Sequence, residues 1–166
     1  MKGSQKILIL LIVLATVILA SCYGSLDMWK WVILIKAVGL AWMAGQYYQW
    51  RWSGYIGMIF FVVMSARGFL LEIPSLWLLL CTVLALTAWD MNMFLVRINL
   101  AGLAVKRSYL EKCHIKKLAV TACIGFILGA LTLTLDLTIG FGWLILLGIV
   151  LILCMSRLIR ILTNRG

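Results

Sequence analysis

The chain has 166 residues, of which 65% are hydrophobic and 12% are charged. Soluble domains contain roughly 45–50% hydrophobic and about 25% charged residues, so the composition excludes an ordinary soluble domain. The mean hydropathy of +1.13 excludes a disordered chain as well. Membrane spans need about 20 apolar residues each, and about six of them would leave no room for a soluble catalytic domain.

The formal net charge is +10, from 15 Lys and Arg against 5 Asp and Glu. On a soluble protein this excess would indicate nucleic-acid binding. Here the basic residues flank apolar segments instead of forming one long patch, so no nucleic-acid partner is expected. Basic residues beside membrane spans instead indicate how the chain is oriented in the bilayer.

The apolar segments predict an all-α, polytopic transmembrane helix bundle of about six spans, with residues 1–166 as one domain. We expect helices over residues 5–23, 29–48, 53–71, 75–96, 110–135 and 139–161. Pro74 suits the first turn of the fourth helix, where its missing N–H has no helical partner. Ser108 and Glu111 have the spacing of a capping box, which starts the fifth helix near Tyr109.

The first segment allows two interpretations. Its apolar run over residues 7–20 has the length of a signal peptide, and Leu19-Ala20-Ser21-Cys22 resembles the bacterial lipoprotein processing box. Cleavage there would leave five spans and a lipidated Cys22. We favour a retained first helix, since residues 5–23 can cross with slight bilayer thinning.

The basic residues sort onto one side of the membrane if the N-terminus is cytoplasmic. The positive-inside rule then predicts that both termini face the cytoplasm, in what we expect to be a prokaryotic cytoplasmic membrane. On that side fall twelve of the 15 Lys and Arg: Lys2, Lys6, Arg51, Arg97, Lys106, Arg107, Lys112, Lys116, Lys117, Arg157, Arg160 and Arg165.

The predicted cytoplasmic connection over residues 97–117 is strongly basic. Cationic side chains this close to an inner leaflet attract anionic lipids, each by on the order of 1 kcal/mol. Docking of an acidic partner is the alternative. The candidate lipid contacts are Lys106, Arg107, Lys112, Lys116 and Lys117.

Three ionisable residues fall inside predicted spans, where a charge is expensive and needs a reason. Lys36 lies about 10 Å deep and can extend toward the nearer surface. Arg67 is expected to pair with Glu72 or Asp136. Asp90 has no such outlet, so we expect either an ion pair with Arg97 or Arg51, or a role in handling protons or cations.

Small residues four apart let helices approach closely in lipid. Ala37, Ala41 and Gly45 form such a strip in the second helix, and Gly125 and Gly129 form another in the fifth. We interpret both as packing inside the bundle rather than between subunits.

Residues with catalytic chemistry are few. The five cysteines stand singly, without a CxxC pair, and the one histidine, His114, rules out a bis-histidine haem or a His-rich metal site. We therefore assign no catalytic residue, metal or cofactor, and an enzyme is the least favoured class. The leading prediction is a non-catalytic subunit or accessory and assembly factor of a larger membrane complex. The alternative is a small-solute or ion transporter or channel acting as a homo-oligomer.

Overall fold

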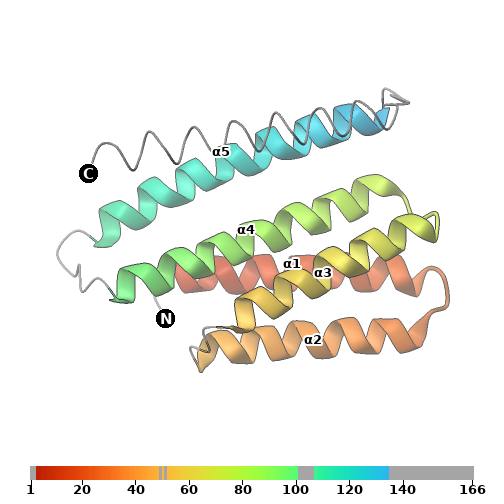
Figure 1. Ribbon diagram of the computed structural model, residues 1–166, viewed down its shortest axis with the longest axis horizontal. Helices are drawn as coiled ribbons and strands as arrows, with labels where there is room; N and C mark the ends of the chain where they lie inside the picture. The colour runs from red at the N-terminus through yellow and green to blue at the C-terminus, as the bar shows by residue number, and fades with distance from the viewer. Residues whose placement is uncertain (1–2, 49, 51, 101–106, 135–166) are drawn as a thin grey trace, which may run out of the picture. The chain divides into compact units, whose positions relative to one another are not determined.

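A computed structural model describes residues 3–48, 50, 52–100 and 107–134, which form five α-helices (Figure 1). The expected all-α fold is confirmed, and each described helix begins and ends within a few residues of its predicted bounds. The sixth predicted helix, over residues 139–161, lies outside the described residues, so a count of six is not confirmed. The helices are α1 (Gly3–Gly24), α2 (Trp29–Tyr47), α3 (Ser53–Leu70), α4 (Ser75–Leu100) and α5 (Arg107–Thr134).

Four of these helices are long and apolar enough to cross a membrane, which identifies a helical membrane protein. They are α1, α3, α4 over Ser75–Ile98 and α5 over Tyr109–Leu133. Helix α2 has 19 residues but does not reach the same hydropathy. Lys30, Lys36 and Gln46 lower its average, so α2 differs in character from its neighbours.

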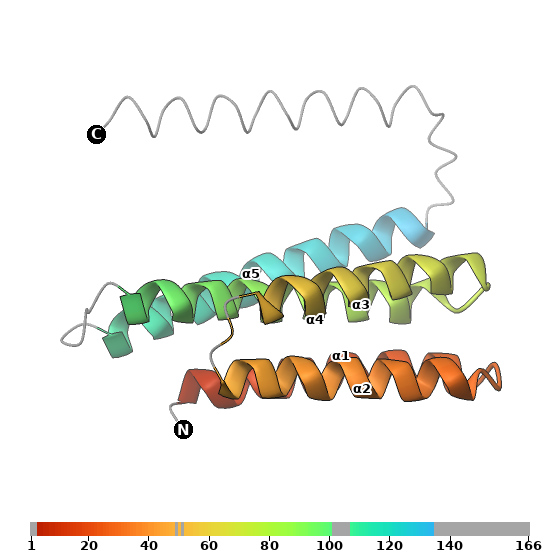
Figure 2. The ribbon, with the colours of Figure 1, turned by 60° about the horizontal axis from the view of Figure 1, so that its bottom comes forward.

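Helices α1 to α4 form an antiparallel bundle in two layers, with α1 beside α2 and α3 beside α4 (Figure 2). Each helix packs against the next one in the chain, and α1 closes the bundle by packing against α4. Leu8, Ile12, Ala15 and Leu19 are buried at alternating spacings of four and three residues. This spacing places them on one face of α1, which forms the core of the bundle with the buried face of α4.

The two turns at one end of the bundle are built alike. Asp27, between α1 and α2, and Glu72, between α3 and α4, have left-handed backbones, with φ of 57° and 58°. Beyond each of them a backbone N–H closes back on the preceding helix, from Met28 to Tyr23 O and from Ile73 to Gly68 O. These are helix C-caps of the Schellman type. We call this end, residues 25–28 and 71–74, the turn end, and the end where α1 begins the N-terminal end.

Trp42 fills the contact between α2 and α3. It is only 2% exposed, and its ring lies 5.6 Å from that of Phe61, measured between centroids. The indole sits directly against Gly57, where an added Cβ would lie 2.2 Å from Trp42 Cδ2. Only glycine at position 57 leaves room for this ring.

Helix α5 packs more lightly than the other four. None of the residues in its most apolar stretch is buried. Ile115 and Leu118 contact the core, and the backbone at Gly129 approaches the side chain of Leu79. Side chains near the N-terminal end of the bundle provide further contacts, which are described below.

Candidate functional site

One face of α2 is turned away from the rest of the bundle. We call it the exposed α2 face. It consists of Ile33, Lys36, Ala37, Leu40, Ala41 and Ala44, all of which are exposed. The opposite side of the helix carries Val32, Ile35, Gly39, Trp42 and Gly45, which are buried against α1 and α3.

This arrangement corrects our interpretation of the small-residue strips. Ala37 and Ala41 are exposed and do not pack inside the bundle, whereas Gly45 does, against Ser53. The close contact on the α1 side is made by Gly39, where an added Cβ would lie 2.4 Å from Thr16 Oγ1. In α5, Gly129 lies against Leu79, but Gly125 has nothing within 4 Å.

Lys36 belongs to the exposed α2 face, seven residues after the start of the helix at Trp29. At 1.5 Å per residue this places its Cα about 10 Å from that end. No carboxylate of the described residues lies within ion-pair distance of its ammonium group. Lys36 is therefore an exposed cation on a helix that falls short of the hydropathy of the four candidate spans, without an ion-pair partner among the described residues.

Arg67 is held differently from our expectation. Its guanidinium carbon lies 3.7 Å from the centre of the Trp31 ring, a cation–π contact between α3 and α2. One turn earlier in α3, the carbonyl of Met64 accepts a hydrogen bond of 2.9 Å from the Tyr23 hydroxyl. Glu72 lies in the turn that follows α3, and Asp136 is outside the described residues. Arg67 thus helps to join α2 to α3 near the turn end.

Asp90 meets a partner that the sequence analysis did not consider. His114 of α5 places Nε2 3.2 Å from Asp90 Oδ2, although its N–H direction does not meet the geometry of a hydrogen bond. The imidazole also stacks on Phe94, with centroids 3.8 Å apart and planes 7° from parallel. Arg97, one of the two expected partners, is exposed, and Arg51 lies outside the described residues.

The position of His114 explains why it was missed. Asp90 lies ten residues before the end of α4, and His114 lies seven residues after the start of α5. Antiparallel neighbours bring two such positions to a similar depth, but helix length does not tell which side chains face one another. The Asp90 side chain is 46% exposed and that of His114 22%, so the pair lies at the edge of the bundle and not in its core.

A second polar link joins α5 to α1, because the Ser4 hydroxyl donates a hydrogen bond to Glu111 Oε2. Several basic residues lie on the same part of α5 as Glu111. Lys112, Lys116 and Lys117 are exposed on the first turns of α5. Arg107 is the first residue of that helix, and Lys106 lies outside the described residues. Since α4 extends to Leu100, most of the predicted 97–117 connection is helical.

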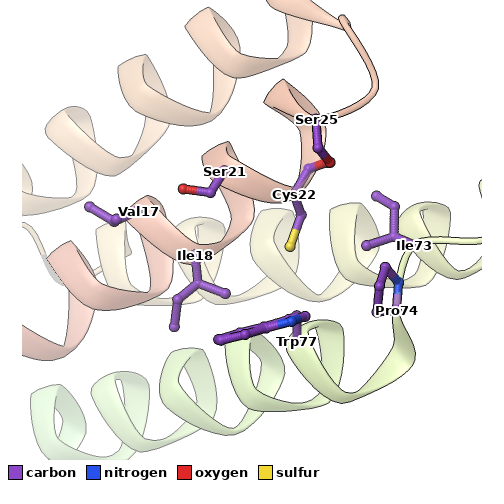
Figure 3. Close-up of a pocket in the computed structure, with 8 residues that line it drawn as sticks. All are labelled: Val17, Ile18, Ser21, Cys22, Ser25, Ile73, Pro74 and Trp77. Carbon is purple, nitrogen blue, oxygen red and sulfur yellow. The ribbon is translucent and has the colours of Figure 1, made fainter.

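Cys22 lies near the end of α1 and lines a pocket of about 360 Å³ (Figure 3). Its sulfur points into the space between α1 and the start of α4, toward the ring of Trp77 (Figure 3). Ser21 and Ser25 add hydroxyl groups to the lining, and the Ser25 hydroxyl is already bonded to Cys22 O at 2.8 Å. The remaining lining is apolar, from Val17, Ile18, Ile73 and Pro74.

No family model, curated protein or solved structure matches this chain. The fold and the local chemistry therefore define its class, a helical membrane protein, and the function has to be argued from its own residues.

Proposed function

We propose that this chain is a non-catalytic subunit or accessory factor of a larger membrane complex, attached through the exposed α2 face. The observation that carries the proposal is the character of that face. Among the described helices, α2 is the one whose hydropathy is too low for a candidate span. Its exposed face nevertheless extends over successive turns of the helix and includes Lys36.

Lipid and protein make different demands on such a face. Hydrocarbon offers no hydrogen-bond partner, so a lysine there is costly and is normally paired. Three alanines, Ala37, Ala41 and Ala44, offer little apolar area to lipid tails, but they allow the backbone of another helix to come close. A neighbouring membrane protein satisfies both features, and a lipid tail satisfies neither.

The test is to isolate the protein from its own membranes in a mild detergent and analyse it by native-gel mass spectrometry. We expect co-migrating membrane proteins at fixed stoichiometry. A photoreactive amino acid at Leu40 should cross-link one of them. The same probe at Ile127, which is 63% exposed on α5, is the matched control and should capture lipid. Migration of the protein as a lone monomer or homo-oligomer contradicts the proposal.

Transport is a second candidate, favoured by one observation, the Asp90–His114 pair. Carboxylate and imidazole side chains are the groups that build proton relays in membrane transporters, and here the two lie 3.2 Å apart. If the chain couples flux to protons as a homo-oligomer, Asp90→Asn should abolish that flux in proteoliposomes. Unchanged flux in this variant would leave Asp90 as a structural partner of His114.

The exposed lysines at the start of α5 extend the proposal to lipids. We expect Lys112, Lys116 and Lys117 to lie at the cytoplasmic headgroups and to favour anionic ones. The support is their exposure on one helical segment, beside the Ser4–Glu111 link that fixes this end of α5.

A further inference from the structure

We infer that the docking of α5 on α4 is sensitive to pH, because protonation of His114 creates a cation that the Asp90 carboxylate holds, and loss of that proton loosens α5. The proton then acts as a ligand that shifts α5 between a docked and a displaced state. This regulation goes beyond the proposed function, because it concerns α5 and not the exposed α2 face.

Helix α5 is attached to the bundle near its beginning, through side chains that can change their charge. Ser4 of α1 donates a hydrogen bond to Glu111, and Asp90 of α4 meets His114, one turn further along α5. None of the residues in the most apolar stretch of α5 is buried, whereas 33–39% of that stretch is buried in α1, α3 and α4. The polar contacts therefore matter more for the attachment of α5 than for that of the other candidate spans.

The geometry of the Asp90–His114 pair offers little to a neutral imidazole. Nε2 and Oδ2 lie 3.2 Å apart, but the N–H direction does not meet the geometry of a hydrogen bond. A neutral ring with its proton on Nδ1 would present a lone pair to the carboxylate instead. An imidazolium is attracted at this distance without such a requirement on direction, because the attraction between opposite charges depends on their separation. The pair thus becomes attractive when His114 gains a proton.

The ring of Phe94 favours the same charged form. It stacks on the imidazole, with centroids 3.8 Å apart and planes 7° from parallel. The face of an aromatic ring attracts a cation through its quadrupole. Asp90 and Phe94 are four residues apart on α4 and so lie on one face of it. A proton on His114 therefore strengthens two contacts with the same helix.

The other charged groups on the helices around His114 act on it less directly. Glu111, one turn earlier on α5, is a second carboxylate, so it does not oppose a cation at His114. The cations whose side chains are described are all exposed, where water and salt screen them more than a partly buried pair. They are Lys6 of α1, Arg97 of α4, and Lys112, Lys116 and Lys117 of α5. Asp90 acts instead by direct contact.

We expect the docking of α5 to strengthen as the pH falls and to weaken as it rises. Histidine is the side chain that ordinarily changes its charge between about pH 5 and about pH 8. Protonation of histidines in this range changes interfaces in other pH-sensitive proteins. The response of α5 should fall in the same range.

The position of α5 can be measured with pairs of spin labels, by double electron–electron resonance on the full chain in lipid nanodiscs. In a cysteine-free background, Leu86→Cys of α4 and Val120→Cys of α5 place labels on both sides of the contact, at side chains that are 43% and 53% exposed. Between about pH 5 and about pH 8, we expect the ratio of docked to displaced molecules to fall by about twofold to fivefold, the range for partly exposed ion pairs. A reference pair, Leu86→Cys with Ile33→Cys of α2, should not change.

Two variants each remove one charge from the pair. We expect His114→Gln to abolish the pH response and Asp90→Asn to remove most of it. Glu72→Gln is the matched control, since it removes a carboxylate at the turn end, and it should keep the full response. Because His114 is the one histidine of the chain, isotope-labelled histidine gives a single imidazole signal in nuclear magnetic resonance. Its titration should coincide with the change in label distances.

Several results would overturn the inference. One is an equal docked fraction at both pH values in the unmodified chain, and another is a response that survives in His114→Gln. A response that does not follow the imidazole signal, or that also appears in the reference pair, would do the same. The reference pair in each variant reports whether the four-helix bundle is intact, and the unmodified chain with its single histidine signal tests the inference without any variant at the pair.

Discussion

At the scale of single residues, glycine–side chain contacts hold the four-helix bundle together. Gly57 receives the ring of Trp42, and Gly54 lies against the amide of Asn92, where an added Cβ would be 2.3 Å from Nδ2. Both large side chains are buried. Because a packed interior cannot absorb even one extra methyl group without displacement, we expect both positions to tolerate no side chain larger than that of glycine.

We expect Gly57→Ala to destabilise the protein by about 1–3 kcal/mol, the usual cost of overpacking. Thermal unfolding of the detergent-solubilised protein, followed by circular dichroism, should show a midpoint lowered by at least about 2 °C. Gly125→Ala is the control, since nothing lies within 4 Å of an added Cβ there, and it should not lower the midpoint. Equal effects of the two substitutions would contradict the described α2–α3 contact.

The buried face of α2 was not predictable from its small residues. Small residues were recognised as packing residues, but the strip was assigned to the wrong side of α2. In a membrane both sides of a helix are apolar, so the contrast that marks the buried face of a soluble helix is weak. The small residues that do pack, Cys81, Ala85 and Ala88 of α4, follow alternating spacings of four and three, which is a signal that could have been used.

At the scale of helices, α1 is a structural member of the bundle. It packs against both α2 and α4, and Cys81 Sγ lies 3.6 Å from the carbonyl of Ala15. Removing residues 1–21 would expose the buried side chains of α4 that now contact α1. Packing therefore favours the retained first helix over the processed form.

We predict that no cleavage occurs before Cys22 in the mature protein. Mass spectrometry of the membrane-extracted chain should find a peptide that crosses the Ser21–Cys22 bond, with Cys22 unmodified. A mature N-terminus at Cys22 carrying lipid would show that the processing box is used and would reduce the number of spans by one.

Few contacts join helix α5 to the bundle, so its contact with α4 can be tested by cross-linking one pair of positions. In a cysteine-free background, we expect Leu79→Cys with Gly129→Cys to be joined by a short thiol cross-linker, since an added Cβ at Gly129 would lie 2.9 Å from Leu79 Cδ1. Leu79→Cys with Gly125→Cys is the matched control and should remain unlinked. Efficient linkage of the control pair, or none in the first pair, contradicts the described α4–α5 contact.

The elements themselves were more predictable than their contacts. Pro74 and the acidic turn before it marked the end of α3 and the start of α4, and apolar run length located the other described helices. The partner of Asp90 could not be assigned, because it depends on how α4 and α5 are rotated about their axes. That rotation is determined by contacts such as Phe94 against His114, which no local pattern encodes.

At the scale of the whole molecule, the charge distribution still predicts the orientation. With alternating helices, Cys113 near the start of α5 and Asp27 in the first turn lie at opposite ends of the bundle, and both are exposed. The positive-inside rule places the end with Cys113 in the cytoplasm.

Thiol labelling can check this orientation. Using single-cysteine variants and a membrane-impermeant reagent, we expect Asp27→Cys to react in intact cells and Cys113 to react only after lysis. Cys81, which is buried, should react in neither state and serves as the control for leakage and unfolding. Labelling of Cys113 before lysis would reverse the predicted topology.

The low hydropathy of α2 also has a consequence for biogenesis. A lysine near the centre of a nascent helix opposes its release from the translocon into lipid by about 2.5–3.5 kcal/mol, and α2 contains Lys36 with little apolar excess to offset it. Helix α1 is strongly apolar, immediately precedes α2 and packs against it. We therefore expect the two to leave the translocon together as a helical hairpin, with the early-synthesised α1 acting as an intramolecular chaperone for α2.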